Sequence, residues 1–468
     1  MIVLQHTSTS VDLQQNKFAF MNEEKRSIKN LYFALLNNEI NQQTKNEMIN
    51  FIENILLDQN NTTCELPEDF NHLAQFLDSQ LHKTGEEYRT YLTQREAGLP
   101  RRFFPTKSHA LIFLQHISPT KKIDGAWLYS VLNYLQDPRA SSLIHTYLDE
   151  LGNGRAHQNH VLIFQNLLSS EGIHVHNDLP DPYYLQGCVQ QALGWMDHDY
   201  LPEIIGFNLG YEQLPLHLLI TAYELNELGI DPHYFGLHIT IDNTVTGHGQ
   251  QAVQALFDFM PLRNQQAFYQ RVRDGYRLNQ TGLGVQDIIQ KIDLNQSVIQ
   301  LFIQKARTGQ YAHSNYCHLE GKTINEWLLD SALIPTFLEV LENKGWIKKN
   351  VAAENSRFWH AISHEKAPMF GVFTKAEQQI IRDWIEGDFS NHRKYIPFKS
   401  SYLFNAKNND DQIPTPEDPD LIFLKHQLKL CTDPIHRAKL LQPYLSPARH
   451  VLPVGLWATQ EFKKLLDK

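Results

Sequence analysis

Residues 231–249 read DPHYFGLHITIDNTVTGHG and contain three histidines and two aspartates among apolar residues. The apolar spacing predicts a helix over 232–261. His238 and Asp242 are four residues apart, so a helix places them on one face, one turn apart. A neutral nitrogen and an anionic oxygen on one apolar face suit a redox-active iron or manganese better than a hydrophobic core.

Helical periodicity also dominates the rest of the chain. Further helices are predicted over 23–57, 66–98, 106–116, 124–136, 142–169, 184–196, 201–228, 285–308, 324–343 and 375–387. The helix over 142–169 is interrupted at Gly152-Asn-Gly154, and residues 174–182 and 405–420 have the Pro, Asn and Asp content of loops. Since no strand pattern is convincing and no repeat is found, the predicted fold class is all-α.

The composition of the chain argues against a nucleic-acid-binding, secreted or membrane-spanning protein. The chain has 468 residues, is 42% hydrophobic and 20% charged, and carries a net charge of −10, which argues against nucleic-acid binding. Its four cysteines lie far apart without a Cys-x-x-Cys pair, which fits a reducing compartment. The N-terminus lacks the basic and apolar regions of a secretory signal, and no apolar run is long enough to span a membrane, so we expect a cytoplasmic protein without membrane contact.

Side chains typical of a metal centre occur at four places along the chain. The candidate ligands are Asp124, Glu150, His160, Glu212, His238, Asp242 and His248. A dinuclear iron site that activates oxygen needs carboxylates, which stabilise the oxidised metal and can bridge two ions, together with one or two histidines per metal. No GxGxxG fingerprint follows a strand, so no internal flavin or nicotinamide domain is expected, and electrons would come from an external reductase or from a second turnover of ferrous iron.

Several of these stretches together resemble the haem-oxygenase-like di-iron oxidases and oxygenases, often called iron-containing redox enzymes. The matching stretches are Pro119-Thr120, Asp124-Gly-Ala-Trp-Leu128, Glu150-Leu-Gly-Asn-Gly154 with His160, Tyr234-Phe-Gly-Leu-His-Ile-Thr-Ile-Asp242, Gly247-His248 and Pro368-Met-Phe-Gly-Val-Phe-Thr-Lys-Ala-Glu377. The resemblance covers about Tyr88 to Glu386.

The resemblance implies a haem-oxygenase-like helical bundle whose core helices present ligands to two irons. It implies Glu150, His160, Glu212, His238 and Asp242 as ligands, with the shorter Asp124 where the family often has a glutamate. His248 is the last expected ligand. Many relatives place this histidine three residues after the aspartate, where this chain has Val245. A regular helix would turn His248 about 120° away from the Asp242 face, so a π-bulge or unwinding near Thr246-Gly247 is needed to align it.

Four segments are predicted: an N-terminal helical segment over 1–87, the di-iron core over 88–275, a C-terminal helical part of the family region over 276–400, and a linker with a helical tail over 401–468. The resemblance implies an O2-dependent non-haem di-iron oxidase or oxygenase. Its cofactors would be two ferrous ions, with a manganese–iron pair left open. Its reaction would be N-oxygenation, desaturation or oxidative C–C cleavage of a small molecule, and a homodimer is left open.

Two other functions remain open from the sequence. One is a haem-binding or haem-degrading protein of the same fold, although haem needs one axial histidine and basic groups for its propionates. The other is a non-catalytic helical interaction protein. At single positions the structural alternatives are that Asp124 caps the helix at Ala126 and that Glu212 is a surface carboxylate. Trp127, Tyr211 and Phe235 are expected as core aromatics.

Overall fold

The computed structural model describes residues 27–59, 62–175, 177–241, 247–392, 395–398 and 418–467. Almost all of its regular structure is helical, which confirms the all-α prediction and is consistent with a haem-oxygenase-like fold. The two strands in the described residues are β1 (His318–Leu319) and β2 (Lys322–Thr323), which pair antiparallel with His318 opposite Thr323. Apolar faces at helical spacing and side-chain caps such as Asn41, Asn159 and Asp293 explain why these segments are helices.

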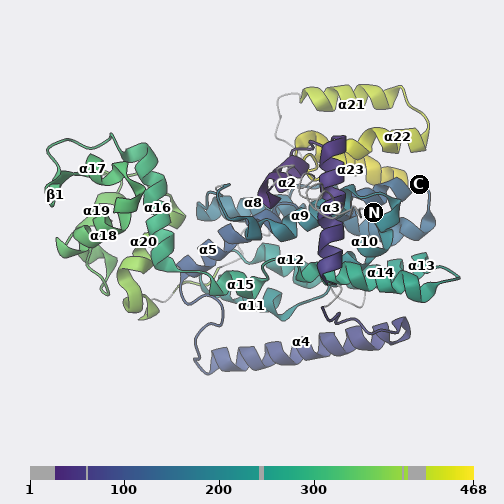
Figure 1. Ribbon diagram of the computed structural model, residues 1–468, viewed down its shortest axis with the longest axis horizontal. Helices are drawn as coiled ribbons and strands as arrows, with labels where there is room; N and C mark the ends of the chain where they lie inside the picture. The colour runs from purple at the N-terminus through teal and green to yellow at the C-terminus, as the bar shows by residue number, and fades with distance from the viewer. Residues whose placement is uncertain are drawn as a thin grey trace, which may run out of the picture.

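Helices α2 to α14 form the main body (Figure 1). Their bounds are α2 (Ile28–Leu36), α3 (Gln42–Asp58), α4 (Leu73–Glu96), α5 (Lys107–His116), α6 (Ser118–Lys121), α7 (Ser141–Glu150), α8 (His160–Glu171), α9 (Leu185–Trp195), α10 (Leu201–Tyr211), α11 (Leu216–Glu227), α12 (His233–Ile241), α13 (His248–Phe259) and α14 (Gln265–Arg277). Short 3-10 helices connect them: η2 (Phe70–His72), η3 (Ala126–Tyr134), η4 (Pro138–Ala140), η5 (Gly152–Gly154), η6 (Asp181–Tyr183) and η7 (His198–Tyr200).

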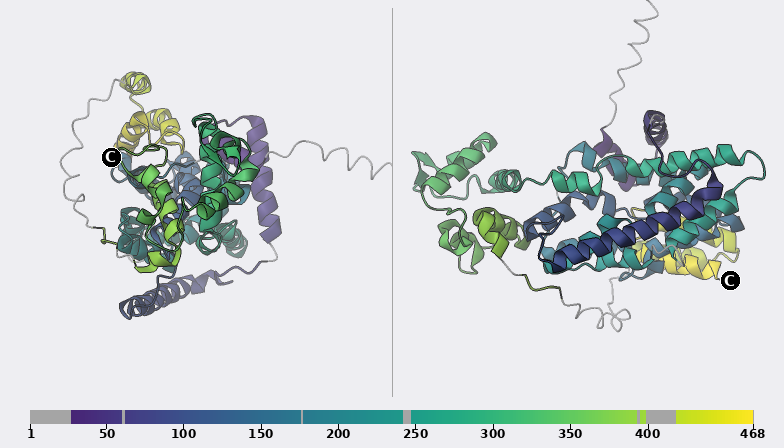
Figure 2. Two further views of the ribbon diagram at one scale, coloured as in Figure 1. Left: turned by 90° about the vertical axis from the view of Figure 1, so that its left-hand side faces the viewer. Right: turned by 90° about the horizontal axis from the view of Figure 1, so that it is seen from below.

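The elements after α14 belong partly to a separate lobe and partly to the main body. The bounds of the first group are η8 (Leu278–Gln280), α15 (Val285–Gln290), α16 (Leu294–Gly309), α17 (Ile324–Leu329), η9 (Ser331–Leu333), α18 (Ile334–Asn343), η10 (Ala353–Asn355), α19 (Arg357–Ser363), α20 (Lys375–Glu386) and η11 (Gly387–His392). Of these, α16 to α20 form a lobe beside the main body (Figures 1 and 2). The last elements, α21 (Pro419–Lys429), α22 (Pro434–Leu441), η13 (Gln442–Leu445) and α23 (Pro453–Leu466), return to the main body.

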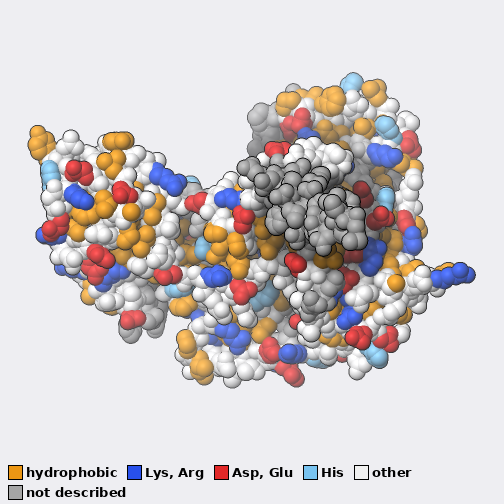
Figure 3. All heavy atoms as spheres, viewed as in Figure 1, with side chains coloured by type: hydrophobic (Ala, Val, Ile, Leu, Met, Phe, Trp, Pro, Cys, Tyr) orange, Lys and Arg blue, Asp and Glu red, His pale blue; other side chains and the backbone are white. Residues whose placement is uncertain are grey.

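Three clusters of buried apolar side chains hold these elements together. The first joins α2, α3, α7, α9, α10, α13 and α14 with η3 and the C-terminal α21 to α23. The second joins α4, α5, α8, α11 and α12, and the third fills the lobe of α16 to α20. On the face drawn in Figure 3, acidic and basic side chains are interspersed over both the body and the lobe.

Several predicted helices are broken where the sequence pattern runs on. The helix over 201–228 is wrong between Glu212 and Pro215, because Pro215 lies at the start of α11 and cannot continue the hydrogen bonds of α10. The helix over 232–261 is also wrong, since Gly247 within it is extended and is the N-cap of α13, which begins at His248. Residues 124–136 contain a 3-10 helix instead of an α-helix.

Smaller corrections apply elsewhere. The predicted helices over 285–308 and 324–343 are each interrupted, at 291–293 and 330–333. The predicted segment boundaries at 87/88 and 275/276 fall inside α4 and α14, and the boundary at 400/401 lies outside the described residues, so the division into four segments stays a prediction. None of the helices in the described part of the chain combines the length and the apolar character that a bilayer crossing needs.

Candidate metal centre

Six of the seven predicted ligands lie together at the seam between the first and second apolar clusters. Glu150 ends α7, Glu212 directly follows α10, and His248 begins α13, and these three helices pack in the first cluster. His160 begins α8 and His238 lies in α12, and both helices belong to the second cluster. The two halves of the body therefore meet at polar side chains.

The positions of the carboxylates oppose the helix dipoles. Glu150 and Glu212 stand at the C-terminal ends of α7 and α10, where the dipole is negative and a carboxylate is disfavoured by about 0.3–1 kcal/mol. An acidic side chain at such an end needs a compensating positive charge. A cation held between these carboxylates would supply that charge.

The six side chains form two groups with metal-ligand composition. Asp124, Glu150, His160 and His238 form one group, in which one ligand atom from each residue lies within 4.8 Å of the others. Glu150, Glu212 and His248 form the second group by the same measure. All six are buried. Glu150 belongs to both groups, so it is the residue that two neighbouring metal ions would share.

Asp124 is fixed by two tyrosines and a lysine. Tyr211 donates from its hydroxyl to Asp124 Oδ1 over 2.8 Å, and Tyr234 donates to Oδ2. Lys121 Nζ donates to the Tyr211 hydroxyl over 2.7 Å and lies 3.6 Å from Asp124 Oδ1. The expected alternative, that Asp124 caps the Ala126 helix, is not what the structure has, since η3 begins without a side-chain cap.

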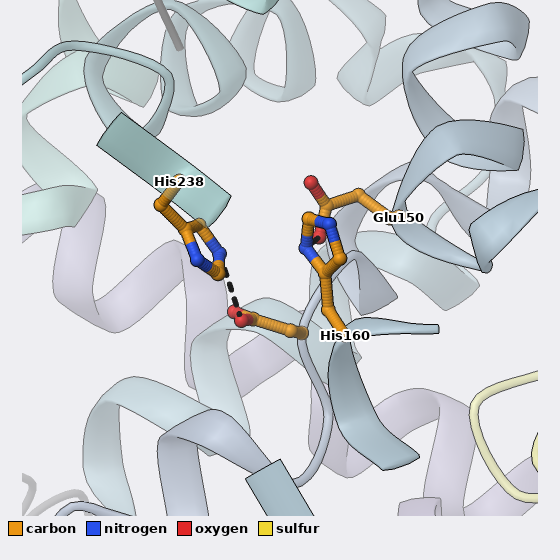
Figure 4. Close-up of side chains that lie close together, drawn as sticks. Glu150, His160 and His238 are labelled. Carbon is orange, nitrogen blue, oxygen red and sulfur yellow. Dashed lines mark ion pairs between the residues drawn. The ribbon is translucent and has the colours of Figure 1, made fainter. Parts of the chain in front are cut away.

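The orientation of His238 leaves one ring nitrogen for a metal. Its Nδ1–H donates to the Tyr234 carbonyl over 2.9 Å, one turn earlier in α12. Its Nε2 points to Asp124 Oδ2 at 3.4 Å (Figure 4). A histidine whose second nitrogen donates to a carbonyl has its tautomer fixed with the other lone pair directed at the metal.

His248 is oriented in the same manner by a carboxylate. Its Nδ1 lies 3.2 Å from Glu212 Oε2 and 3.6 Å from Glu150 Oε1, and its Nε2 lies 3.5 Å from Asp149 Oδ2. A carboxylate on the far nitrogen of a ligating imidazole is a usual feature of metal sites. Asp149 is therefore an orienting residue for the second group.

The unsatisfied polar atoms at this site fit a metal better than they fit hydrogen bonding. Glu150 Oε2 and His160 Nδ1 approach to 2.8 Å without the alignment of a hydrogen bond (Figure 4). At this site, the buried atoms without a hydrogen-bond partner among the described residues include Glu150 Oε2, His160 Nδ1, His160 Nε2, Glu212 Oε1 and His238 Nε2. An atom that also lacks an ion-pair partner within this part of the chain, as for His160 Nε2 and Glu212 Oε1, costs about 1–3 kcal/mol in a dry interior. Carboxylate oxygens and imidazole nitrogens with free lone pairs are the donors that iron takes.

The charged groups of the site shift one another's pKa values in the direction opposite to the effect of burial. Burial by itself raises the pKa of Asp124 and Glu150, but Lys121 and His238 lower the first and His160 lowers the second, so both stay below their ordinary values. Burial lowers the pKa of His248, yet Glu212 and Asp149 raise it to about 11. His160 likewise has its pKa raised by Glu150 against the effect of burial, so the carboxylates favour the cationic forms of His160 and His248, and a divalent metal would displace those protons.

The seventh predicted ligand, Asp242, lies outside the described residues. His248 needed a break in the helix, and the structure has one, because Gly247 is the extended N-cap of α13. Tyr234, Asp149 and the donor role of Tyr211 were missed. Their positions next to candidate ligands in the sequence could have indicated them. Tyr234 is one helical turn before His238, and Asp149 and Tyr211 directly precede Glu150 and Glu212.

Comparison with known proteins agrees with this chemistry. Residues 111–280 match the model of a family described as iron-containing redox enzymes, which confirms the predicted resemblance and supports an iron-dependent oxidoreductase. The six clustered side chains all lie in this segment, whereas Pro368–Glu377 lies beyond it. No curated protein and no solved structure matches the chain.

Proposed function

We propose that this protein is a non-haem di-iron oxidoreductase that uses dioxygen to oxidise a small molecule. The observation that carries the proposal is the pair of ligand groups that share Glu150. A shared carboxylate is the arrangement expected of two metals bound side by side. Asp124, His160 and His238 would hold one ion, Glu212 and His248 the other.

When bound, an iron pair supplies the redox chemistry that makes dioxygen reactive, and the protein supplies orientation and surroundings. Tyr211 and Tyr234 hold the Asp124 carboxylate in one orientation. The Tyr234 carbonyl and Asp149 hold the rings of His238 and His248. Burial of all six ligands excludes bulk water, which protects an oxidising site from side reactions.

The proposed type of reaction rests on the chemistry of a non-haem di-iron centre. N-oxygenation, desaturation or oxidative C–C cleavage of a small molecule are the reactions that such a centre supports, with electrons from an external donor. A manganese–iron pair would use the same oxygen and nitrogen ligands. The carboxylate-rich ligand set favours metal ions over haem, which takes one axial histidine.

The first experiment is an anaerobic ferrous titration of the full chain followed by metal analysis. We expect about two irons per chain, as a two-metal centre requires. Glu150→Gln keeps the side-chain shape but removes the bridging charge, so it should bind fewer than one iron per chain. Glu203→Gln is the matched control, because Glu203 is buried on α10 but pairs with Arg271, 2.7 Å away, outside the cluster.

Mixing the loaded protein with dioxygen then tests redox function. A transient visible absorption that Glu150→Gln lacks is expected. A stoichiometry of one, or equal binding by Glu150→Gln and the wild type, would contradict a dinuclear site. A Soret shift on haem addition, without iron binding, would favour the haem alternative.

A further inference from the structure

The C-terminal elements α21 to α23 return to the loop that connects two of the candidate ligands. This segment, residues 418–467, lies beyond the part of the chain that matches the iron-containing redox family. Through Leu424, Leu441 and Phe462 it joins the first apolar cluster, which also contains side chains of α7 and α9. Figure 1 shows α21 to α23 against the main body. Helix α23 also contacts η5, which lies in the loop 151–159 between Glu150 and His160.

Asn159 links this loop to the C-terminal segment. Its Oδ1 accepts from the Leu162 amide over 3.1 Å as the N-cap of α8, the helix that begins with His160. Its Nδ2 donates to the Leu151 carbonyl over 3.2 Å and to His450 Nδ1 over 3.0 Å. Asn159 is 0% and His450 1% exposed, so water does not compete for these bonds. One buried amide thus touches the residue after Glu150, the helix of His160 and the C-terminal segment.

A second contact holds the middle of the loop. Gln460 Nε2 in α23 donates to the Gly154 carbonyl over 2.9 Å. Gly154 has φ +78°, and a Cβ at this position would lie 2.3 Å from the Leu456 carbonyl oxygen. The backbones of α23 and of the loop therefore approach more closely than a side chain would allow. On the other side of Glu150, the Tyr147 hydroxyl in α7 donates to the Leu445 carbonyl.

The loop needs such support because it has little of its own. Between α7 and α8 it contains one short 3-10 turn, and three of its residues, Gly152, Asn153 and Gly154, have positive φ. Two ligands that flank a loop of this kind reach one metal only if the loop is held in a single conformation. The bonds from His450 and Gln460 lie within the segment that sets the separation of Glu150 and His160.

We propose that residues 418–467 act as a clamp that holds the ligand loop and so determines how tightly the centre binds iron, with His450 and Gln460 as positioning residues. This inference rests on the proposed function, because it concerns the metal affinity of the same site. Among the described residues, the side-chain hydrogen bonds of His450 and Gln460 go to the loop, at Asn159 and Gly154, and not to a candidate ligand.

The test compares full-length variants that remove one bond each. Gln460→Ala and His450→Leu remove the two loop contacts, while His450→Asn retains an acceptor for Asn159. Gln442→Ala is the matched control, since Gln442 Nε2 also ties the C-terminal segment to the body, over 2.9 Å to Asn133 Oδ1, but away from the loop. Ferrous affinity is measured anaerobically against a competing chelator, and hydrogen exchange over 151–160 is measured in metal-free protein.

We expect Gln460→Ala and His450→Leu to weaken iron binding about 10- to 100-fold, as is usual for groups that orient ligands, and to speed exchange over 151–160. His450→Asn should recover most of the affinity, and Gln442→Ala should bind iron like the wild type. Equal affinity and equal exchange in Gln460→Ala and Gln442→Ala would overturn the clamp, whether or not His450→Leu folds. If the wild type binds no iron, the proposed function fails, and the exchange rates alone decide on the clamp.

Discussion

At the scale of single residues, the tyrosine hydroxyl groups around Asp124 determine how its carboxylate is oriented. Tyr234 lies in the second apolar cluster and is 1% exposed, yet its hydroxyl donates to a buried carboxylate. Asp124 is shorter than a glutamate, so its reach depends on where these hydroxyls hold it. Removing one hydroxyl leaves the packing intact and changes only the orientation of the ligand.

We therefore expect Tyr234→Phe to lower iron affinity about 10- to 100-fold, the usual effect of losing a bond that orients a ligand. Tyr129→Phe is the control, because Tyr129 is also buried but its hydroxyl donates to the Gln442 carbonyl, 3.4 Å away. Both affinities can be measured in the same chelator competition. Equal affinities of the two variants would show that the Tyr234 hydroxyl does not orient Asp124.

His116 makes stability depend on pH at the end of α5. Burial lowers its pKa to about 4, and its ring packs against Tyr183 with centroids 4.9 Å apart. An unfolded histidine titrates near 6.5, so from pH 6.5 down to 4 the unfolded chain binds a proton that the folded chain does not. This histidine contributes its stability above pH 6.5, and the contribution is lost as the pH falls towards 4.

Replacing it by a side chain that does not titrate should flatten this dependence. When the pH falls from 6.5 to 4, the free energy of unfolding should decrease less in His116→Gln than in the wild type. The expected difference is about 1–3 kcal/mol, because solvent partly screens the charge of this histidine. Urea denaturation at several pH values measures the difference. His426→Gln is the control because His426 is exposed on α21, and a profile of His116→Gln parallel to the wild type would contradict the prediction.

At the scale of elements, the turn before η3 packs directly on the end of α7. Gly125 has φ +79°, and a Cβ there would lie 2.7 Å from Glu150 Cβ. Gly125→Ala should therefore destabilise the fold by about 1–3 kcal/mol and weaken iron binding, since both the strained backbone and the bridging ligand must shift. Thermal unfolding and iron titration of one preparation test both effects.

The control for this change is Gly85→Ala in α4, where nothing lies within 4 Å of the added carbon. A helical glycine of this kind costs stability, so the substitution should stabilise by about 0.5–1 kcal/mol and leave iron binding unchanged. If Gly125→Ala behaved like Gly85→Ala, the close packing of the turn against Glu150 would not matter for the centre.

Elements also show what the sequence could predict. Periodicity located α5, α9 and α20 nearly to the residue, because their apolar faces end where their helices end. It failed at Glu212–Pro215, where apolar spacing continues through a bend that places Glu212 in the centre. Spacing within one helix paired His238 with Asp242, which lies outside the described residues, so that pairing stays a prediction. The contact of His238 with Asp124, more than a hundred residues away, could not be predicted from spacing. Contacts of that range depend on tertiary packing.

At the scale of the whole molecule, the candidate metal centre lies where the first two apolar clusters meet, and the C-terminal segment 418–467 packs nearby. The family resemblance implied the candidate ligands, but no sequence pattern connected His450 or Gln460 to them, because contacts between residues so far apart in the sequence arise only from tertiary packing. The six clustered ligands come from α7, α8, α10, α12 and α13 and from the turn before η3. They meet only when both clusters have formed.

Under the proposed function, metal binding would therefore be linked to folding of the body. A ligand that binds only the folded state stabilises it by about 2.7 kcal/mol at a concentration one hundred times its dissociation constant. Anaerobic ferrous iron should accordingly raise the unfolding temperature of the wild type, with an increase that grows with the logarithm of the iron concentration. Glu150→Gln should show little of this increase, and Glu203→Gln should show all of it, because only Glu150 belongs to both ligand groups. Differential scanning calorimetry at several iron concentrations measures the effect, and an equal increase in all three proteins would place the stabilising iron somewhere other than this seam.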